Sequence, residues 1–180
     1  MITRILLLVL LLGSSFVSQA SPLQSRDHLT QQEVDLVKEA QVLDKRIDVF
    51  IKAAERRLMV INGSAAGNAK QLKKDSERWG DLPTGSRAEL VTDIARILDE
   101  AITNIDDVSA RDERNPLIPK ALRKLAQAVN TIMGQLKPLS TEAKSDAEIA
   151  SFEQVNEGAQ SILEAATKLP PEAEKKEKKN

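Results

Sequence analysis

Few side chains in this chain of 180 residues could support chemistry. The sequence has no cysteine and a single histidine, His28. Covalent haem attachment needs Cys-x-x-Cys-His, di-iron bundles need Glu-x-x-His on facing helices, and nucleophilic catalysis needs a nucleophile beside a base. None of these patterns occurs in the sequence. We therefore predict that the protein is not an enzyme and holds no catalytic residues, metal or cofactor.

The acids that most resemble a site are Asp93, Glu100 and Asp107, which recur at seven-residue spacing. This spacing repeats along one side of a helix, so the three carboxylates spread over about 21 Å. A calcium site needs several oxygens that converge from one compact loop. We therefore predict a solvated acidic face here. We also predict a solvated position for His28, just before the first helix.

Aromatic side chains are scarce, and one of them stands out. Phe50 and Phe152 fall on apolar stripes and are predicted core residues. Trp79 instead ends a lysine-rich segment and directly precedes the turn-forming residues 80–85. Either it closes the end of a helical bundle or it anchors a partner, because tryptophan beside cationic side chains is typical of binding hot spots. The hypothesised partner-contact edge consists of Trp79, Lys73, Lys74 and Arg78.

The elements that must position these residues are helices. Apolar side chains recur at alternating three- and four-residue steps, which puts one apolar stripe on each helix. Each stripe must be buried against another helix. The pattern predicts an all-α, antiparallel bundle of four main amphipathic helices near 30–61, 87–109, 118–137 and 142–169, with a short extra helix near 69–79.

Local signals mark the ends of these helices. Capping boxes, in which Ser or Thr is followed three residues later by Glu, begin at Thr30, Ser86 and Ser145. Pro138 is expected to stop the third long helix, because its ring donates no backbone hydrogen bond. Two glycines within residues 62–68 interrupt the first helix, so the chain either bends there or turns back.

Charged residues sort by helix. Residues 87–108 carry six acids and two bases, residues 117–137 carry four bases and no acid, and residues 141–169 carry six acids and two bases. We expect these charges to pair within the bundle, because exposed helix pairs normally do no more than this. The net charge of −1 is too balanced to indicate nucleic acid as a partner.

The ends of the chain predict export and a flexible tail. Arg4, the unbroken apolar run 5–12 and the small residues near Ala20 match a cleavable signal peptide over residues 1–20. The apolar run is shorter than the roughly 20 residues that span a bilayer, so we expect no stable membrane anchor after cleavage. Residues 21–28 are predicted to be a flexible segment, 29–169 a single helical domain, and 170–180 a disordered Glu/Lys tail.

These features predict an exported, non-enzymatic protein that acts by protein–protein binding or scaffolding, in the periplasm or outside the cell. Its protein partner is not indicated by any motif. One alternative is a chaperone-like holdase, which needs an apolar surface left uncovered. Another is a carrier of an apolar small ligand, which needs a cavity in the bundle interior. A homo-oligomer is also possible, because apolar stripes do not show whether the helix that covers them is internal.

Overall fold

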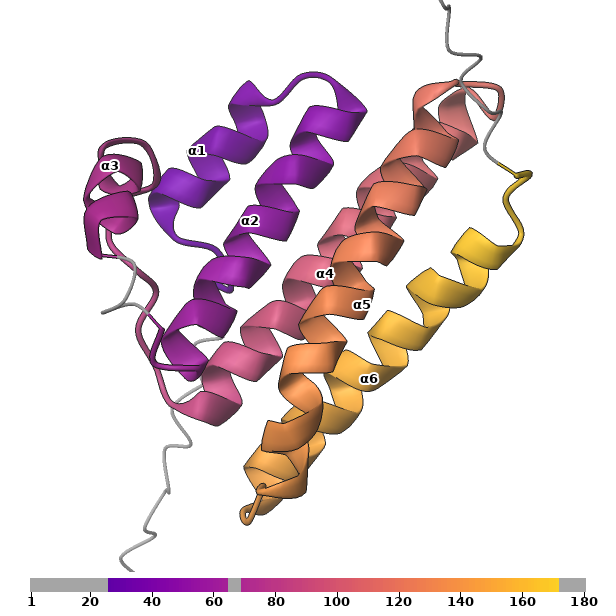
Figure 1. The fold of residues 1–180 in the computed structure, drawn as a ribbon. Coiled ribbons are helices and arrows are strands. Elements are labelled where there is room, and N and C mark those ends of the chain that lie inside the picture. The colour runs from indigo at the N-terminus through magenta and orange to yellow at the C-terminus, as the bar shows by residue number, and fades with distance from the viewer. Residues whose placement is uncertain (1–25, 65–68, 172–180) are drawn as a thin grey trace, which may run out of the picture.

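The computed structural model describes residues 26–64 and 69–171, and this part of the chain is all-helical, without a strand. The prediction of an all-α helical bundle is confirmed (Figure 1). The six helices are α1 (Gln31–Glu39), α2 (Leu43–Ile61), α3 (Ala69–Trp79), α4 (Arg87–Arg111), α5 (Leu117–Thr141) and α6 (Asp146–Thr167).

Four long helices form the bundle; on one side of it α1 packs against α2, and α3 packs against α1 (Figure 1). Around the bundle, α2 packs against α4 and α5, and α6 packs against the same two helices. Short connections, 112–116 and 142–145, reverse the chain between α4, α5 and α6. Consecutive long helices therefore alternate in direction as predicted. The neighbours α4 and α6, and likewise α2 and α5, run parallel to each other.

The apolar stripes meet in one continuous core. Phe50, Ile94 and Leu125 are fully buried, and Phe152 is 7 % exposed. Phe50 and Phe152 are thus core residues, as their position on the stripes predicts. Partly buried side chains such as Val34 and Met133 pack around this cluster. Burial of apolar area at about 25 cal/mol per Å² is the main force that holds the four helices together.

The predicted helix 30–61 is wrong in one respect, because it is two helices. The chain leaves α1 at Ala40 (φ −75°, ψ 82°) and enters α2 through the extended residue Val42. Arg46 Nε donates to the Ala40 carbonyl at 3.0 Å, so this carbonyl has a hydrogen-bond partner where α1 ends. Neither glycine nor proline lies there. A continuous helix would put Glu33 about 35 Å from Arg56, whereas the fold brings their side chains into contact.

The second predicted interruption is resolved as a turn. The chain leaves α2 through Gly63, whose φ of 63° suits glycine. The amides of Gly63 and Ser64 donate to the carbonyls of Val60 and Met59, which is the Schellman pattern of a helix end. Residues 65–68 lie outside the described part of the chain. The next helix, α3, contacts α1 rather than extending α2.

Two other helix ends differ from prediction. Pro138 does not stop α5, which continues to Thr141. Within a helix, a proline leaves the carbonyl four residues earlier without a donor. Here that carbonyl belongs to Gly134, which lies on the outer side of α5. The last turn is held by bonds such as that from the Thr141 hydroxyl to the Pro138 carbonyl. The final helix begins at Asp146 and not at 142, because Ser145 is the residue that caps it.

The charges pair within the bundle. The basic helix α5 pairs with α2: Lys120 Nζ lies 2.6 Å from Asp44, and Lys124 Nζ lies 2.7 Å from Asp48. Arg87 joins the two acidic helices α4 and α6 through Glu148 at 2.8 Å. These pairs follow from the parallel neighbours of the bundle, which sequence order does not reveal.

The two ends of the chain are described only in part. The predicted signal peptide lies outside the described residues, as do 21–25 of the predicted flexible segment and 172–180 of the predicted tail. Arg26, Asp27 and His28 are described, and two of them are bonded to α4. The flexible segment over residues 21–28 stays a prediction.

Candidate functional site

Two consecutive arginines of α2 organise the side of the bundle that carries α1 and α3. Arg56 and Arg57 are each 1 % exposed, and both reach the same buried carboxylate, Glu33 of α1. Glu33 Oε1 accepts from Arg57 Nη1 at 2.6 Å and from Arg56 Nε at 3.2 Å. Its other oxygen accepts from the Thr30 amide at 2.9 Å. One carboxylate thus closes the capping box of α1 and neutralises buried charge on α2.

The guanidinium group of Arg56 also fixes the segment that follows α3. Its Nη2 donates to the carbonyls of Trp79, Gly80 and Asp81, at 3.1, 3.2 and 2.5 Å. The Arg56 Cζ lies 5.8 Å from the centre of the Trp79 ring, within the range of a cation–π contact. Burial lowers the pKa of Arg56, and the nearby Glu33 carboxylate opposes this shift. Trp79 is therefore held by its backbone as well as by one face of its ring.

A hollow of about 430 Å³ lies between α1, α2 and α3, and we call it the α1–α3 hollow. Its apolar lining includes Leu36 and Val49, each 6 % exposed, together with the half-buried Trp79. Charged side chains of both signs complete it. The full lining is Leu36, Glu39, Ala40, Lys45, Asp48, Val49, Arg78 and Trp79.

The structure brings together only part of the predicted contact edge. Trp79 and Arg78 line the same hollow, and Arg78 is exposed. Lys73 lines an adjacent hollow of about 300 Å³ beside Arg56 and Ser76. Lys74 is exposed on α3. Each of the two interpretations of Trp79 fits one part of its surroundings. Arg56 lies over one side of the ring, as for a residue that closes the end of the bundle. The hollow lies at another side, as for a residue that anchors a partner.

Sequence reasoning missed a second set of charges, on α4. Asp93 was predicted to be solvated, and this prediction is wrong: it is 3 % exposed, and its Oδ2 lies 2.6 Å from Arg26 Nη2 and 3.9 Å from Arg57 Nε. Burial raises the pKa of Asp93 although both arginines act to lower it. The Arg57 Nε has no hydrogen-bond partner.

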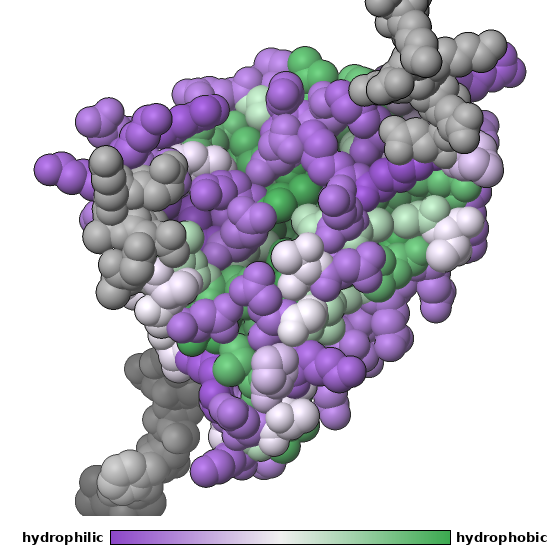
Figure 2. Space-filling view, in the orientation of Figure 1, coloured by the Kyte–Doolittle hydropathy of each residue, from purple (hydrophilic) through white to green (hydrophobic). Residues whose placement is uncertain are grey.

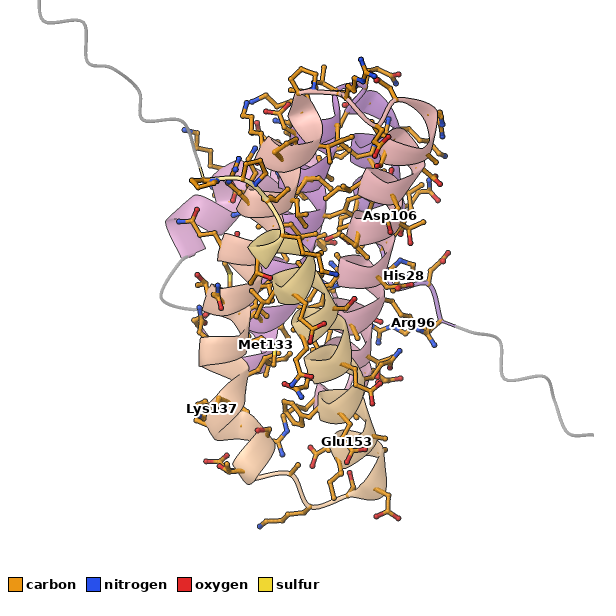
Figure 3. All side chains as sticks on the ribbon, turned by 90° about the vertical axis from the view of Figure 1, so that its right-hand side faces the viewer. His28, Arg96, Asp106, Met133, Lys137 and Glu153 are labelled. Atoms are coloured by element: carbon orange, nitrogen blue, oxygen red, sulfur yellow. The ribbon has the colours of Figure 1, made fainter. Side chains whose placement is uncertain are left out.

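The same segment places the histidine. His28 Nε2 lies 2.8 Å from Glu100 Oε2, and the two side chains are 25 % and 37 % exposed. The predicted solvated position of His28 is therefore only partly correct. Figure 3 shows His28 near Arg96 of α4, where the N-terminal segment approaches the bundle. The spacing of the acids could not predict this cluster. Asp93 and Asp107 occupy the same repeat, and only the packing of Arg26 and Arg57 against Asp93 distinguishes it from the exposed Asp107.

A further groove of about 580 Å³ opens between α5 and α6, and we call it the α5–α6 groove. Its apolar lining is formed by Met133, Leu136, Ile149 and Phe152. Met133 and Lys137 lie on the α5 side and Glu153 on the α6 side (Figure 3). Hydrophobic surface is visible between polar side chains over the part of the molecule that α5 and α6 form (Figure 2).

Comparison with protein-family models, with curated proteins and with solved structures finds no match. Within residues 26–64 and 69–171, no three His, Cys, Asp or Glu side chains are grouped so that they could hold a metal ion. None of the described helices is both long and apolar enough to cross a membrane.

Proposed function

We propose that this chain is an exported, non-enzymatic binding protein that holds a short segment of a partner protein in the α1–α3 hollow. The single observation that carries the proposal is the position of Trp79, which lines the hollow while Arg56 fixes its backbone and one side of its ring. A rigid aromatic side chain beside an apolar pocket is typical of a binding hot spot. The signal-like N-terminus supports export.

The charges around the hollow support one kind of occupant. Lys45 and Asp48 lie 3.9 Å apart, and Asp48 also pairs with Lys124, so these charges are largely satisfied. In the part of the chain that the structure describes, Glu39 and Arg78 form no ion pair. The partner segment is therefore an apolar side chain with a basic residue on one flank, opposite Glu39, and an acidic residue on the other, opposite Arg78.

Site-specific photocross-linking tests this proposal. A photoreactive amino acid replaces Arg78 in the full chain, and the same residue at the exposed Arg114, in the turn between α4 and α5, serves as the matched control. Expressed in the source organism, the protein cross-linked at position 78 should capture one recurrent partner that position 114 does not. The cross-linked peptide should contain an apolar residue between a base and an acid.

Trp79→Ala in the same protein completes the test. The bonds from Arg56 go to main-chain carbonyls, so they survive this substitution and the fold is retained. Loss of the ring at a hot spot weakens binding by about 2 kcal/mol or more, or roughly 30-fold in Kd. Equal capture by Trp79→Ala and by the parent protein, or equal capture at positions 78 and 114, would show that the hollow is not the binding site.

A further inference from the structure

The α5–α6 groove has features that the proposed partner site does not use. Ile149 is 43 % exposed on its rim and is one of two large hydrophobic residues exposed in the described chain. Gly134 also lines the groove, and a Cβ built on it meets no atom within 4 Å. The side of α5 at Gly134 is therefore open to close approach by another helix.

The charges of the groove are arranged with opposite signs on its two helices. Lys137 lies on α5 and Glu153 on α6, both are exposed, and neither forms an ion pair with another described residue. A surface that carries a base on one side and an acid on the other is complementary to its own copy. A two-fold axis that runs along the groove lays α5 of one protomer over α6 of the other. Each Lys137 then faces Glu153 of the partner subunit.

We infer that the α5–α6 groove is the interface of a homodimer in which two copies of this chain pair about such an axis. Ile149 on the rim contributes an exposed apolar side chain, Phe152 lines the groove behind it, and Gly134 permits the helices to approach. Two reciprocal ion pairs between Lys137 and the partner's Glu153 fix the register. The occupant of the groove is therefore the α5–α6 hairpin of a second copy, which presents the same surface in return.

This arrangement also has a consequence for scaffolding, which rests on the proposed function. The α1–α3 hollow lies on the side of the bundle opposite α6 (Figure 1). A dimer joined through α5 and α6 therefore carries its two hollows on its outer sides. Such a protein holds two partner segments at once, and the second attachment gains from the high effective concentration that the first creates.

Charge reversal tests the dimer without the partner protein. The protein purified from cells that express the full chain is measured by sedimentation equilibrium and native mass spectrometry over a dilution series. The parent protein should dimerise. Lys137→Glu and Glu153→Lys should each weaken dimerisation by about a hundredfold, because each creates two like-charge pairs. The matched controls Lys38→Glu and Glu55→Lys, at exposed positions of α1 and α2, should dimerise as the parent does.

Mixing the two reversed variants gives the decisive result. In a heterodimer of Lys137→Glu with Glu153→Lys, both contacts regain opposite charges, so this mixture should form a heterodimer although neither variant pairs with itself. A parent protein that stays monomeric at every dilution would overturn the inference. So would reversed variants that dimerise like the parent, or a mixture that forms no heterodimer. Failure here leaves the cross-linking result at Arg78 unaffected, so the two proposals fail separately.

Discussion

Removing the Glu33 carboxylate should destabilise the protein far more than removing the same group from a similar helix cap. Two buried guanidinium groups share Glu33, at 2.6 and 3.2 Å. Loss of one member of a buried ion pair costs about 3–5 kcal/mol, because the remaining charge stays desolvated. Loss of the cap itself adds about 1 kcal/mol. Glu33→Ala should therefore lower the free energy of unfolding by about 4–6 kcal/mol.

The chain contains its own control for this experiment. Glu89 closes an equivalent capping box at the start of α4, where its Oε2 accepts from the Ser86 amide at 2.7 Å. Its side chain is 55 % exposed, and its one ion pair, with Arg26, spans 3.8 Å. Glu89→Ala should cost about 1 kcal/mol, the value of the cap alone. The difference between the two losses in free energy of unfolding measures the cost of leaving Arg56 and Arg57 buried without their carboxylate.

Urea denaturation followed by two signals is the appropriate assay. Circular dichroism reports the whole bundle, whereas fluorescence reports Trp79, the only tryptophan of the chain. Because Glu33 connects α1 to the arginine that fixes Trp79, the fluorescence transition of Glu33→Ala should precede the loss of helix. Equal losses of stability for Glu33→Ala and Glu89→Ala, within about 1 kcal/mol, would refute the reasoning.

Packing and charge also determine how substitutions at Phe50, Arg87 and Lys120 should act. Phe50→Ala, at a fully buried position, should lower the free energy of unfolding by about 3–5 kcal/mol. Ile149→Ala, in the exposed groove, should change the free energy of unfolding of the monomer by about 0.5 kcal/mol or less. Urea denaturation measures both values. The bond from Arg87 lowers the pKa of Glu148 to about 2. The ionised Glu148 therefore stabilises the fold above its ordinary pKa, and this contribution is lost as the pH falls towards 2. NMR titration of the carboxyl group should detect the low pKa, and Arg87→Gln should raise it. Lys120 likewise lowers the pKa of Asp44. Lys120→Met should raise this pKa in the same titration, and an unchanged pKa would exclude the ion pair in solution.

The helical stripes and their caps were predictable because they are local. A side chain three or four residues away lies on the same face of a helix, so the spacing of apolar residues predicts the buried side. The capping boxes at Thr30 and Ser86 both form with their two reciprocal bonds. At Ser145 the hydroxyl caps α6, but the Glu148 side chain accepts from the Lys144 amide and from Arg87 instead. Local sequence gives the cap, and tertiary contacts decide how its carboxylate is used.

The break between α1 and α2 was not predictable in this way. Residues 40–42 contain no glycine, proline or polar cap, and the apolar stripe continues across them. The contacts that depend on this turn are between distant residues: Glu33 and Arg56, 23 residues apart, meet only when α1 folds onto α2. The spacing of apolar residues along the chain does not predict a contact between residues so far apart in the sequence.

The candidate site was predictable in its residue types and not in its surroundings. Trp79 and Arg78 were singled out as neighbours of a turn, and both line the hollow. Its walls come from α1 and α2, whose approach depends on the unpredicted break. Asp93 shows the same limit: seven-residue spacing cannot distinguish it from Asp107, because the difference is made by Arg26, a residue 67 positions earlier in the chain.

The most direct test of the binding account is a titration monitored by Trp79 itself. The partner segment identified by cross-linking at position 78 is prepared as a peptide and added to the full chain, whose emission comes from this one indole. We expect a saturable change in emission and weaker binding after Arg78→Glu, because the acidic flank of the peptide then meets a carboxylate. Binding seen by calorimetry without any change in Trp79 emission, or with an affinity that Arg78→Glu leaves intact, would contradict binding in the α1–α3 hollow.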